Sequence, residues 1–250
     1  MLPYRDENPT ELVPFVTVLC IAANVGVWLF VEGAGGSYAS MQRAVCAYGA
    51  IPGEITGLGS ADPRICPVAD SARLGWLSLV TSMFLHGGWG HLLGNMVFLW
   101  VFGNNVEDSM GHVRFVVFYL LTGLAGGVAH LALNASSGVP TVGASGAISG
   151  VMGAYVLLYP RAAVHVLMPY FLVVRMPAYV VLGYWIVLQV LFGLMERAGA
   201  GGGIAFWAHI GGFFAGFALI KAFARPELVG AKRTKRHLSR SEIREHGWWW

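Results

Sequence analysis

Charged side chains are scarce in this 250-residue chain: they make up 12% of it, whereas hydrophobic residues make up 56%. A soluble domain carries roughly 25% charged residues. A deficit of this size excludes a solvated globular surface and predicts a surface that faces lipid. The net charge is only +3, and the basic residues cluster in one C-terminal tail, which gives no indication of a nucleic-acid partner.

Charge is rarest in six apolar segments. A helix needs about 20 apolar residues to cross a bilayer. We therefore expect an all-α fold, a polytopic membrane bundle of six transmembrane helices at about residues 12–31, 90–106, 113–133, 145–159, 177–195 and 206–223. The flank of the first segment, Arg5-Asp6-Glu7, lacks the basic region of a signal peptide, so we interpret this helix as retained. The fourth segment is short, as expected for a helix that begins inside a cavity.

No internal repeat is visible, so residues 1–225 are predicted to form one membrane domain, with a long outer loop at about 32–75. Residues 226–250 form a basic tail, predicted to be cytoplasmic, whose final Trp248-Trp249-Trp250 has no assigned role. If both termini are cytoplasmic, most lysine and arginine residues lie inside, and only Arg43, Arg64, Arg73 and Arg197 lie outside. This asymmetry favours that orientation and an even number of spans.

Two connections are read from proline and glycine. Residues 160–176 are apolar but interrupted by Pro160 and Pro169, so we expect a loop, with Pro177 in the first turn of the following helix. Residues 199–203 are glycine-rich and are expected to be a flexible outer connection.

Cysteine is also rare, with three in the chain. Cys46 and Cys66 both fall in the predicted outer loop. In an oxidising compartment they could pair, and the alternative is two free thiols; both interpretations stay open at this stage. Cys20 lies in the middle of the first apolar segment, where packing is the simplest role.

Small residues recur four apart in two of the predicted helices. Gly146 and Gly150 share this spacing, as do Gly212 and Gly216, and Ser149 and Gly153 repeat it. Such pairs allow helix backbones to approach closely in lipid. General membrane-helix packing would explain them, but close approach would also bring together the two polar residues that these helices carry.

Those polar residues are Ser145 and His209, and polar groups at membrane depth are costly unless they serve a function. A serine hydroxyl becomes a nucleophile when a neighbouring base takes its proton, and a neutral imidazole is such a base. Taken alone, Ser145 is better explained as a helix cap than as a nucleophile, and His209 alone could be a packed histidine. The predicted topology places both near the outer face, which favours a catalytic pair.

A third polar group, His86-Gly87-Gly88-Trp89-Gly90-His91-Leu92-Leu93-Gly94-Asn95, opens the second span. His91 and Asn95 are four apart and share one helix face, where both offer donors to an oxyanion. His86 would brace the preceding loop. The alternative is a metal site at His86, His91 and His209, but the chain has no His-Glu-x-x-His and no acidic residue at that depth. We therefore expect neither a metal nor a cofactor, and a Ser–His dyad without a carboxylate.

These three motifs together resemble the rhomboid family of intramembrane serine proteases, over about residues 86–223. The resemblance, to bacterial-type members, implies a six-helix core in the bacterial inner (cytoplasmic) membrane, with the active site facing the outer side. It implies Ser145 as nucleophile, His209 as base, and His91, Asn95 and the Ser145 amide as the oxyanion hole. His86, Gly143, Gly146 and Gly212 would be structural residues near the site.

The resemblance also bears on Glu107 and Ser149. Glu107 matches an acidic position of the family at the cytoplasmic end of the second span, although an ordinary interfacial charge is an equal explanation. Some members carry an aromatic residue four positions after the nucleophile, packed on the histidine. Here that position is Ser149, which leaves open what supports His209.

The predicted function is hydrolysis of peptide bonds in or near transmembrane segments of other membrane proteins. The predicted partners are those substrates and the lipid bilayer, with no nucleic acid, and the oligomeric state is not determined. One alternative is a catalytically inactive rhomboid-like chaperone or trafficking factor, which would lack the dyad. Another is a transporter or channel, but none of the spans carries a central charged residue, and His130 is interpreted as a packing residue.

Overall fold

The computed structural model describes residues 1–67, 74–197 and 203–233. Arg73, most of the glycine-rich connection 199–203, and residues 234–250 with the three terminal tryptophans lie outside the described residues. The elements are, in chain order, β1 (Leu2–Asp6), α1 (Phe15–Phe30), α2 (Tyr38–Tyr48), α3 (Pro52–Thr56), α4 (Ser78–Thr81), α5 (Trp89–Met110), α6 (His112–Leu133), α7 (Ser145–Leu158), β2 (Ala163–Leu167), β3 (Val173–Pro177), α8 (Ala178–Arg197), α9 (Phe206–Phe223) and α10 (Pro226–Arg233), with single 3₁₀ turns at Gly33–Gly35, Gly75–Leu77, Ser82–Phe84 and Pro169–Phe171.

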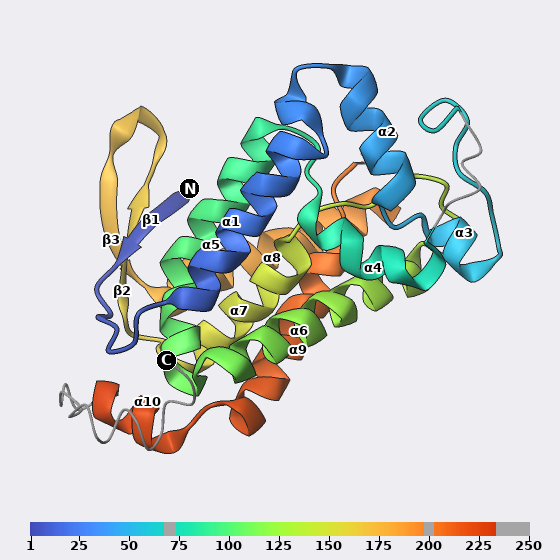
Figure 1. Ribbon diagram of the computed structural model, residues 1–250. Helices are drawn as coiled ribbons and strands as arrows, with labels where there is room; N and C mark the ends of the chain where they lie inside the picture. Colours follow the sequence, from blue (N-terminus) through green and yellow to red (C-terminus); the bar gives the residue numbers. More distant parts are fainter. Residues whose placement is uncertain (68–73, 198–202, 234–250) are drawn as a thin grey trace.

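The molecule is mostly helical, as predicted, and each of the six apolar segments forms a helix: α1, α5, α6, α7, α8 and α9. In Figure 1 the small sheet and α10 lie at one end of this bundle, and α2, α3 and α4 lie at the other. The long helices run between these ends. The site helices α7 and α9 therefore begin at the end that carries the outer loop.

Among the described residues, three helices are long and apolar enough to cross a membrane by length and composition: α6, α8 and α9. The apolar helices α1 and α7 are shorter. Many large apolar side chains on these helices are exposed, such as Phe15, Phe30, Val187 and Phe214. An exposed apolar surface of this kind is suited to lipid, because the hydrocarbon interior offers polar groups no partner. The chain is therefore an integral membrane protein, while the count of six spans stays a prediction.

The connection 160–176 is not the loop that we expected. It forms a hairpin of β2 and β3, and β1 pairs with β2, which gives an antiparallel sheet of order β1-β2-β3. The proline signals were misread. Pro169 lies in the 3₁₀ turn at the hairpin tip, and Pro177 ends β3 instead of lying inside α8, so neither interrupts a strand. The valine-rich runs between the prolines have the β-branched side chains that strands favour.

Polar contacts fix the N-terminal segment to the bundle. Asp6, at the end of β1, accepts hydrogen bonds from the Asn105 side chain (2.8 Å) and from the Tyr155 hydroxyl (2.6 Å). Glu7 bonds with Arg175 of β3 (2.6 and 2.8 Å) and with His165 of β2 (2.8 Å). The Arg175 and His165 hydrogen bonds lower the pKa of the Glu7 carboxyl to about 2. The sheet thus anchors both the entry to α1 and the strand that leads into α8.

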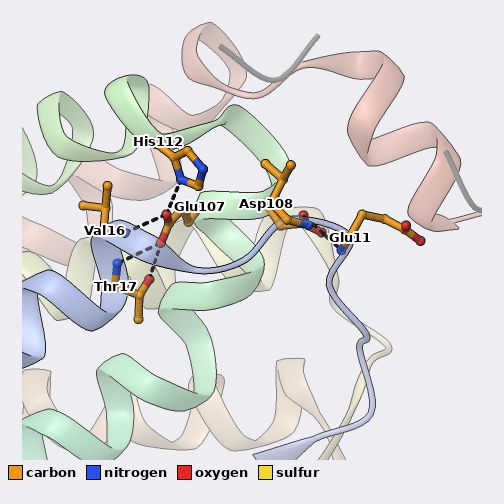
Figure 2. Close-up of polar contacts among 7 residues, drawn as sticks. Glu11, Val16, Thr17, Glu107, Asp108 and His112 are labelled. Atoms are coloured by element: carbon orange, nitrogen blue, oxygen red, sulfur yellow. Dashed lines mark hydrogen bonds and ion pairs between the residues drawn. The ribbon is translucent and has the colours of Figure 1, made fainter. Parts of the chain in front are cut away.

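Glu107, near the end of α5, is a fully buried acidic residue at the sheet end of the bundle. Its buried carboxylate accepts the backbone N–H groups of Val16 (2.9 Å) and Thr17 (2.8 Å), and the Thr17 hydroxyl (2.7 Å). His112 contacts the same carboxylate at 2.5 Å, and neighbouring Asp108 accepts the Glu11 amide, as Figure 2 shows. Unpaired amides collect at a helix N-terminus, where negative charge is stabilising. Glu107 therefore caps the first turn of α1 from another helix.

At the other end, Cys46 and Cys66 form a disulfide, which resolves the question left open by the sequence. Cys46 lies on α2, and the bond ties that helix to the segment near residue 66. The Cys46 side chain, Ile51 and Cys66 form a small buried cluster of the outer loop. Cys20 of α1 is an unpaired, half-buried thiol.

Candidate active site

The helices α7 and α9 touch through their backbones. A Cβ atom added to Gly212 would overlap the carbonyl oxygen of Gly146, and one added to Gly216 would overlap that of Gly150. No residue larger than glycine fits these positions without moving one helix. The four-residue glycine spacing in the sequence therefore corresponds to a close contact between the two helices that carry Ser145 and His209.

This contact brings Ser145 and His209 together. Ser145 is the first residue of α7, and His209 lies in the first turn of α9. The Ser145 Oγ lies 2.7 Å from the His209 Nε2, so the hydroxyl can donate its proton directly to the imidazole. Because these residues are 64 positions apart in the chain, tertiary packing and not local sequence creates the pair.

Gly143 makes room for this arrangement. Its φ of 127° is a conformation that favours glycine, and its N–H donates to the Ser82 carbonyl at 2.9 Å. A Cβ at this position would lie 2.8 Å from the His91 Nε2 and 3.5 Å from the Ser145 Oγ. A side chain at residue 143 would thus separate the two groups that glycine allows to face one space.

That space is a cavity of about 520 Å³, lined by Ser145, His209, His91 and Asn95 among others. The His91 Nδ1 accepts the Gly87 N–H at 3.2 Å, so in the neutral ring the proton lies on Nε2 and makes that atom a donor. The Asn95 side chain is buried, and its Nδ2 has no partner among the described residues. The Ser145 amide adds a donor from the first turn of α7. Several donors thus accompany the hydroxyl, as stabilisation of an oxyanion requires.

His86 lies behind His91 and does not contact the Ser145–His209 pair. Its ring packs edge-on against the His91 ring, with centroids 5.1 Å apart. Its backbone N–H donates to both carboxylate oxygens of Glu32, each at 3.0 Å. Burial lowers the pKa of His86 to about 3, so the ring beside His91 is neutral. The position agrees with the bracing role that we expected, and Glu32 is a partner that sequence reasoning missed.

Two further residues at the site were also missed. The Gln189 Oε1 of α8 lies 2.8 Å from the His209 Nδ1, and the Trp185 ring lies 5.8 Å from the His209 ring, tilted by 36°. Ser149 instead donates to the Ser145 carbonyl within α7. The aromatic neighbour of His209 therefore comes from α8. A signal was available, because Gln189 is the single polar amide in the apolar run 178–195.

The metal site considered as an alternative has no matching cluster of side chains among the described residues. Within the described part of the chain, no group of three or more His, Cys, Asp or Glu side chains is placed to hold a metal ion. His86 and His91 pack ring against ring, and the His209 nitrogens face Ser145 and Gln189.

A serine hydroxyl in contact with an imidazole, with hydrogen-bond donors in the same cavity, is an arrangement that can activate the serine as a nucleophile. Comparison with known proteins identifies the family. The Rhomboid domain family matches residues 73–226, more than half of the chain, and the protein belongs to the rhomboid family.

Its relatives include proteins named as proteases. The chain is 32% identical over 165 residues to "Rhomboid protease GluP" of Bacillus subtilis, which covers 64% of this chain and 28% of that protein. It is 29% identical over 148 residues to "Putative rhomboid protease YdcA" of the same organism, covering 59% and 64%. It is 29% identical over 169 residues to "RHOMBOID-like protein 5" of Arabidopsis thaliana, covering 65% and 47%. The chain thus spans between about a quarter and two thirds of the length of these relatives.

Proposed function

We propose that this protein is an intramembrane serine endopeptidase that hydrolyses peptide bonds in or near transmembrane segments of other membrane proteins. The observation that carries the proposal is the 2.7 Å contact between the Ser145 Oγ and the His209 Nε2, inside a cavity lined by donors. Membership of the rhomboid family, with relatives named as proteases, supports the same class of activity.

The reaction begins when the Ser145 oxygen attacks the scissile carbonyl carbon while its proton moves to the His209 Nε2. The carbonyl π electrons move onto oxygen, and the resulting oxyanion accepts hydrogen bonds from His91, Asn95 and the Ser145 amide. His209 then gives its proton to the departing amine, which leaves an acyl ester on Ser145. Water hydrolyses the ester with His209 again acting as base, which restores the serine hydroxyl.

The proposed setting is a bacterial inner membrane crossed six times, with both termini in the cytoplasm. Ser145 and His209 open their helices at the end that carries the disulfide-bonded loop, so the cavity would face the outer side. A disulfide is typical of oxidising compartments and supports that assignment. A substrate helix must partly unwind to expose its carbonyl, so small or helix-destabilising residues are expected near the cleaved bond.

The test is reconstitution in liposomes with a model transmembrane substrate. We expect Ser145→Ala and His209→Ala each to lower the cleavage rate by at least about 10³-fold, as for other serine hydrolases. Ser109→Ala is the matched control, because the Ser109 hydroxyl bonds to the Val106 carbonyl at the opposite end of α5. A chelator should have no effect.

Cleavage by both Ser145→Ala and His209→Ala at the wild-type rate would contradict the proposal. Loss of activity with the chelator alone would instead indicate metal chemistry. A wild-type protein that binds transmembrane segments but cleaves none would favour the inactive chaperone or trafficking alternative.

A further inference from the structure

We infer that Gln189 is the positioning residue of the site: its side-chain amide selects the tautomer of His209 and holds the ring toward Ser145. The inference rests on the proposed function, because it assigns the group that prepares the proposed base. It also fills the place that a carboxylate occupies in a Ser-His-Asp triad.

Gln189 contacts His209 inside the protein. Gln189 is 9% exposed, so its amide is buried between α8 and α9. Its Oε1 lies 2.8 Å from the His209 Nδ1, while the opposite ring nitrogen lies 2.7 Å from the Ser145 Oγ. The His209 imidazole is thus held at both nitrogens, at Nδ1 by α8 and at Nε2 by α7.

The backbone of α8 determines the orientation of the Gln189 amide. The Gln189 Nε2 faces the Trp185 carbonyl oxygen at 3.4 Å. That oxygen only accepts hydrogen bonds, so the amide must present its NH₂ group there. The reverse orientation would set two acceptor oxygens against each other. The Gln189 Oε1 is therefore the atom that faces His209.

The orientation of the Gln189 amide determines the tautomer of His209. Because the Gln189 Oε1 accepts only, the His209 Nδ1 must carry a proton to bond to it. A neutral imidazole has one proton, so Nε2 keeps its lone pair and can accept the proton of Ser145. With the proton on Nε2 instead, the ring would meet Ser145 as a donor and would not be its base. The Trp185 carbonyl, Gln189, His209 and Ser145 therefore form one directional chain.

Membrane depth explains why an amide would perform this task. An unpaired carboxylate is costly in a low-dielectric interior, whereas a neutral amide accepts the same hydrogen bond without a charge. Trp185 and Gln189 are four residues apart and share one face of α8. That face supplies both the amide at the His209 edge and the aromatic ring at 5.8 Å.

The test compares three variants in the reconstituted cleavage assay. Gln189→Leu keeps the approximate size but removes the acceptor, and we expect kcat to fall about 10- to 100-fold with KM within about threefold of wild type. Gln189→Glu restores an acceptor oxygen, and we expect it to recover at least about tenfold of that loss. Gln42→Leu is the matched control, because the Gln42 amide bonds to the Ile65 carbonyl in the outer loop, away from the cavity.

The pH–rate profile separates positioning from packing. A carboxylate beside His209 stabilises the protonated ring, so Gln189→Glu should move the acid limb to higher pH. The other titratable groups whose charges act on His209 are His91 of α5 and His130 of α6, and both are unchanged in these variants. If Gln189 only filled space, leucine would be tolerated and glutamate would not. That pattern, or a Gln189→Leu kcat within threefold of wild type, would overturn the inference.

A spectroscopic measurement makes the inference independent of cleavage. In ¹⁵N-histidine-labelled protein in micelles, the His209 resonances should report the Nδ1–H tautomer in wild type and a mixture in Gln189→Leu. A wild-type ring with its proton on Nε2 would refute the role of Gln189 even if the protein cleaves substrate. Absence of cleavage together with the Nδ1–H tautomer would refute the proposed function alone.

Discussion

At the residue scale, Glu32 stands out because it is a fully buried carboxylate bonded to the backbone of His86, whose ring packs against His91. It lies two residues beyond the end of α1 and one residue beyond the expected first span, and accepts the His86 N–H with both oxygens. Burial raises its pKa to about 7 from an ordinary value of 4.5, and the hydrogen bond from His86 opposes that rise. The folded protein therefore binds this proton more tightly than the unfolded chain does.

The sign of the pH effect follows. The contribution of Glu32 to stability is fully present below about pH 4.5 and is lost as pH rises through about 7. At about 1.4 kcal/mol per pKa unit, it amounts to at most about 3.5 kcal/mol. We expect Glu32→Gln to remove this part of the pH dependence of thermal unfolding in micelles. Glu227→Gln, at an exposed position of α10, is the control, and equal pH dependence in wild type and Glu32→Gln would contradict the prediction.

Residues also differ in how far the sequence predicted them. Ser145, His209, His91 and Asn95 were singled out because polar side chains at membrane depth are unusual, and the structure brings all four to one cavity. Gln189 carried the same signal but was overlooked, since a neutral amide has no chemistry of its own to suggest. Its role depends on the rotation of α8 about its axis, which a single sequence does not determine.

At the element scale, the α7–α9 contact is the feature on which the site depends. Gly216→Ala would place a methyl group against the Gly150 carbonyl oxygen. We expect it to destabilise the fold by about 1–3 kcal/mol, as overpacking does, and to slow cleavage because Ser145 and His209 move apart. Unfolding and cleavage measured on the same preparation would test both effects.

The matched control is Gly183→Ala on α8, where nothing lies within 4 Å of the added Cβ. Alanine favours the helix by up to about 1 kcal/mol over glycine, so stability should stay the same or rise. A Gly216→Ala protein as stable and active as Gly183→Ala would show that the helices can separate without cost.

The sheet shows where element prediction failed. The run 160–176 was taken as a loop because prolines interrupt it, yet the prolines mark the tip and the end of a hairpin. The third strand, β1, comes from the opposite end of the chain. A pairing between residues 2–6 and 163–167 has no local signature, so a single sequence leaves it hidden.

At the scale of the whole molecule, the long helices were predictable because apolar runs of that length have few alternatives in lipid. Their boundaries agree with the expected segments to within a few residues, except that α5 continues to Met110. The extension exists because Glu107 accepts amides in the first turn of α1, and Asp108 accepts the amides of Glu11 and Leu12 just before that helix, so both carboxylates can lie inside the structure. Those partners are at least 90 residues away in sequence.

The Cys46–Cys66 disulfide constrains the middle of the outer loop. It closes a segment of 20 residues, which in the loop-closure description stabilises the fold by about 3 kcal/mol. We expect a reductant to lower the thermal midpoint of wild type in micelles, while the double variant Cys46→Ser/Cys66→Ser has the lower midpoint from the outset and does not respond. A reductant response in the double variant, or none in wild type, would contradict this prediction.

The glycine contact between α7 and α9 has a consequence for how the site responds to its surroundings. Two helices in backbone contact have no side-chain rotamers between them to adjust, so they tilt and translate as one rigid unit when bilayer thickness changes. The distance between Ser145 and His209 should then be insensitive to lipid composition. Gln189 reaches His209 from a third helix, α8, through a rotatable side chain. A change of membrane should therefore alter the contact between Gln189 and His209, and with it the orientation of the His209 ring, before it alters the distance between Ser145 and His209.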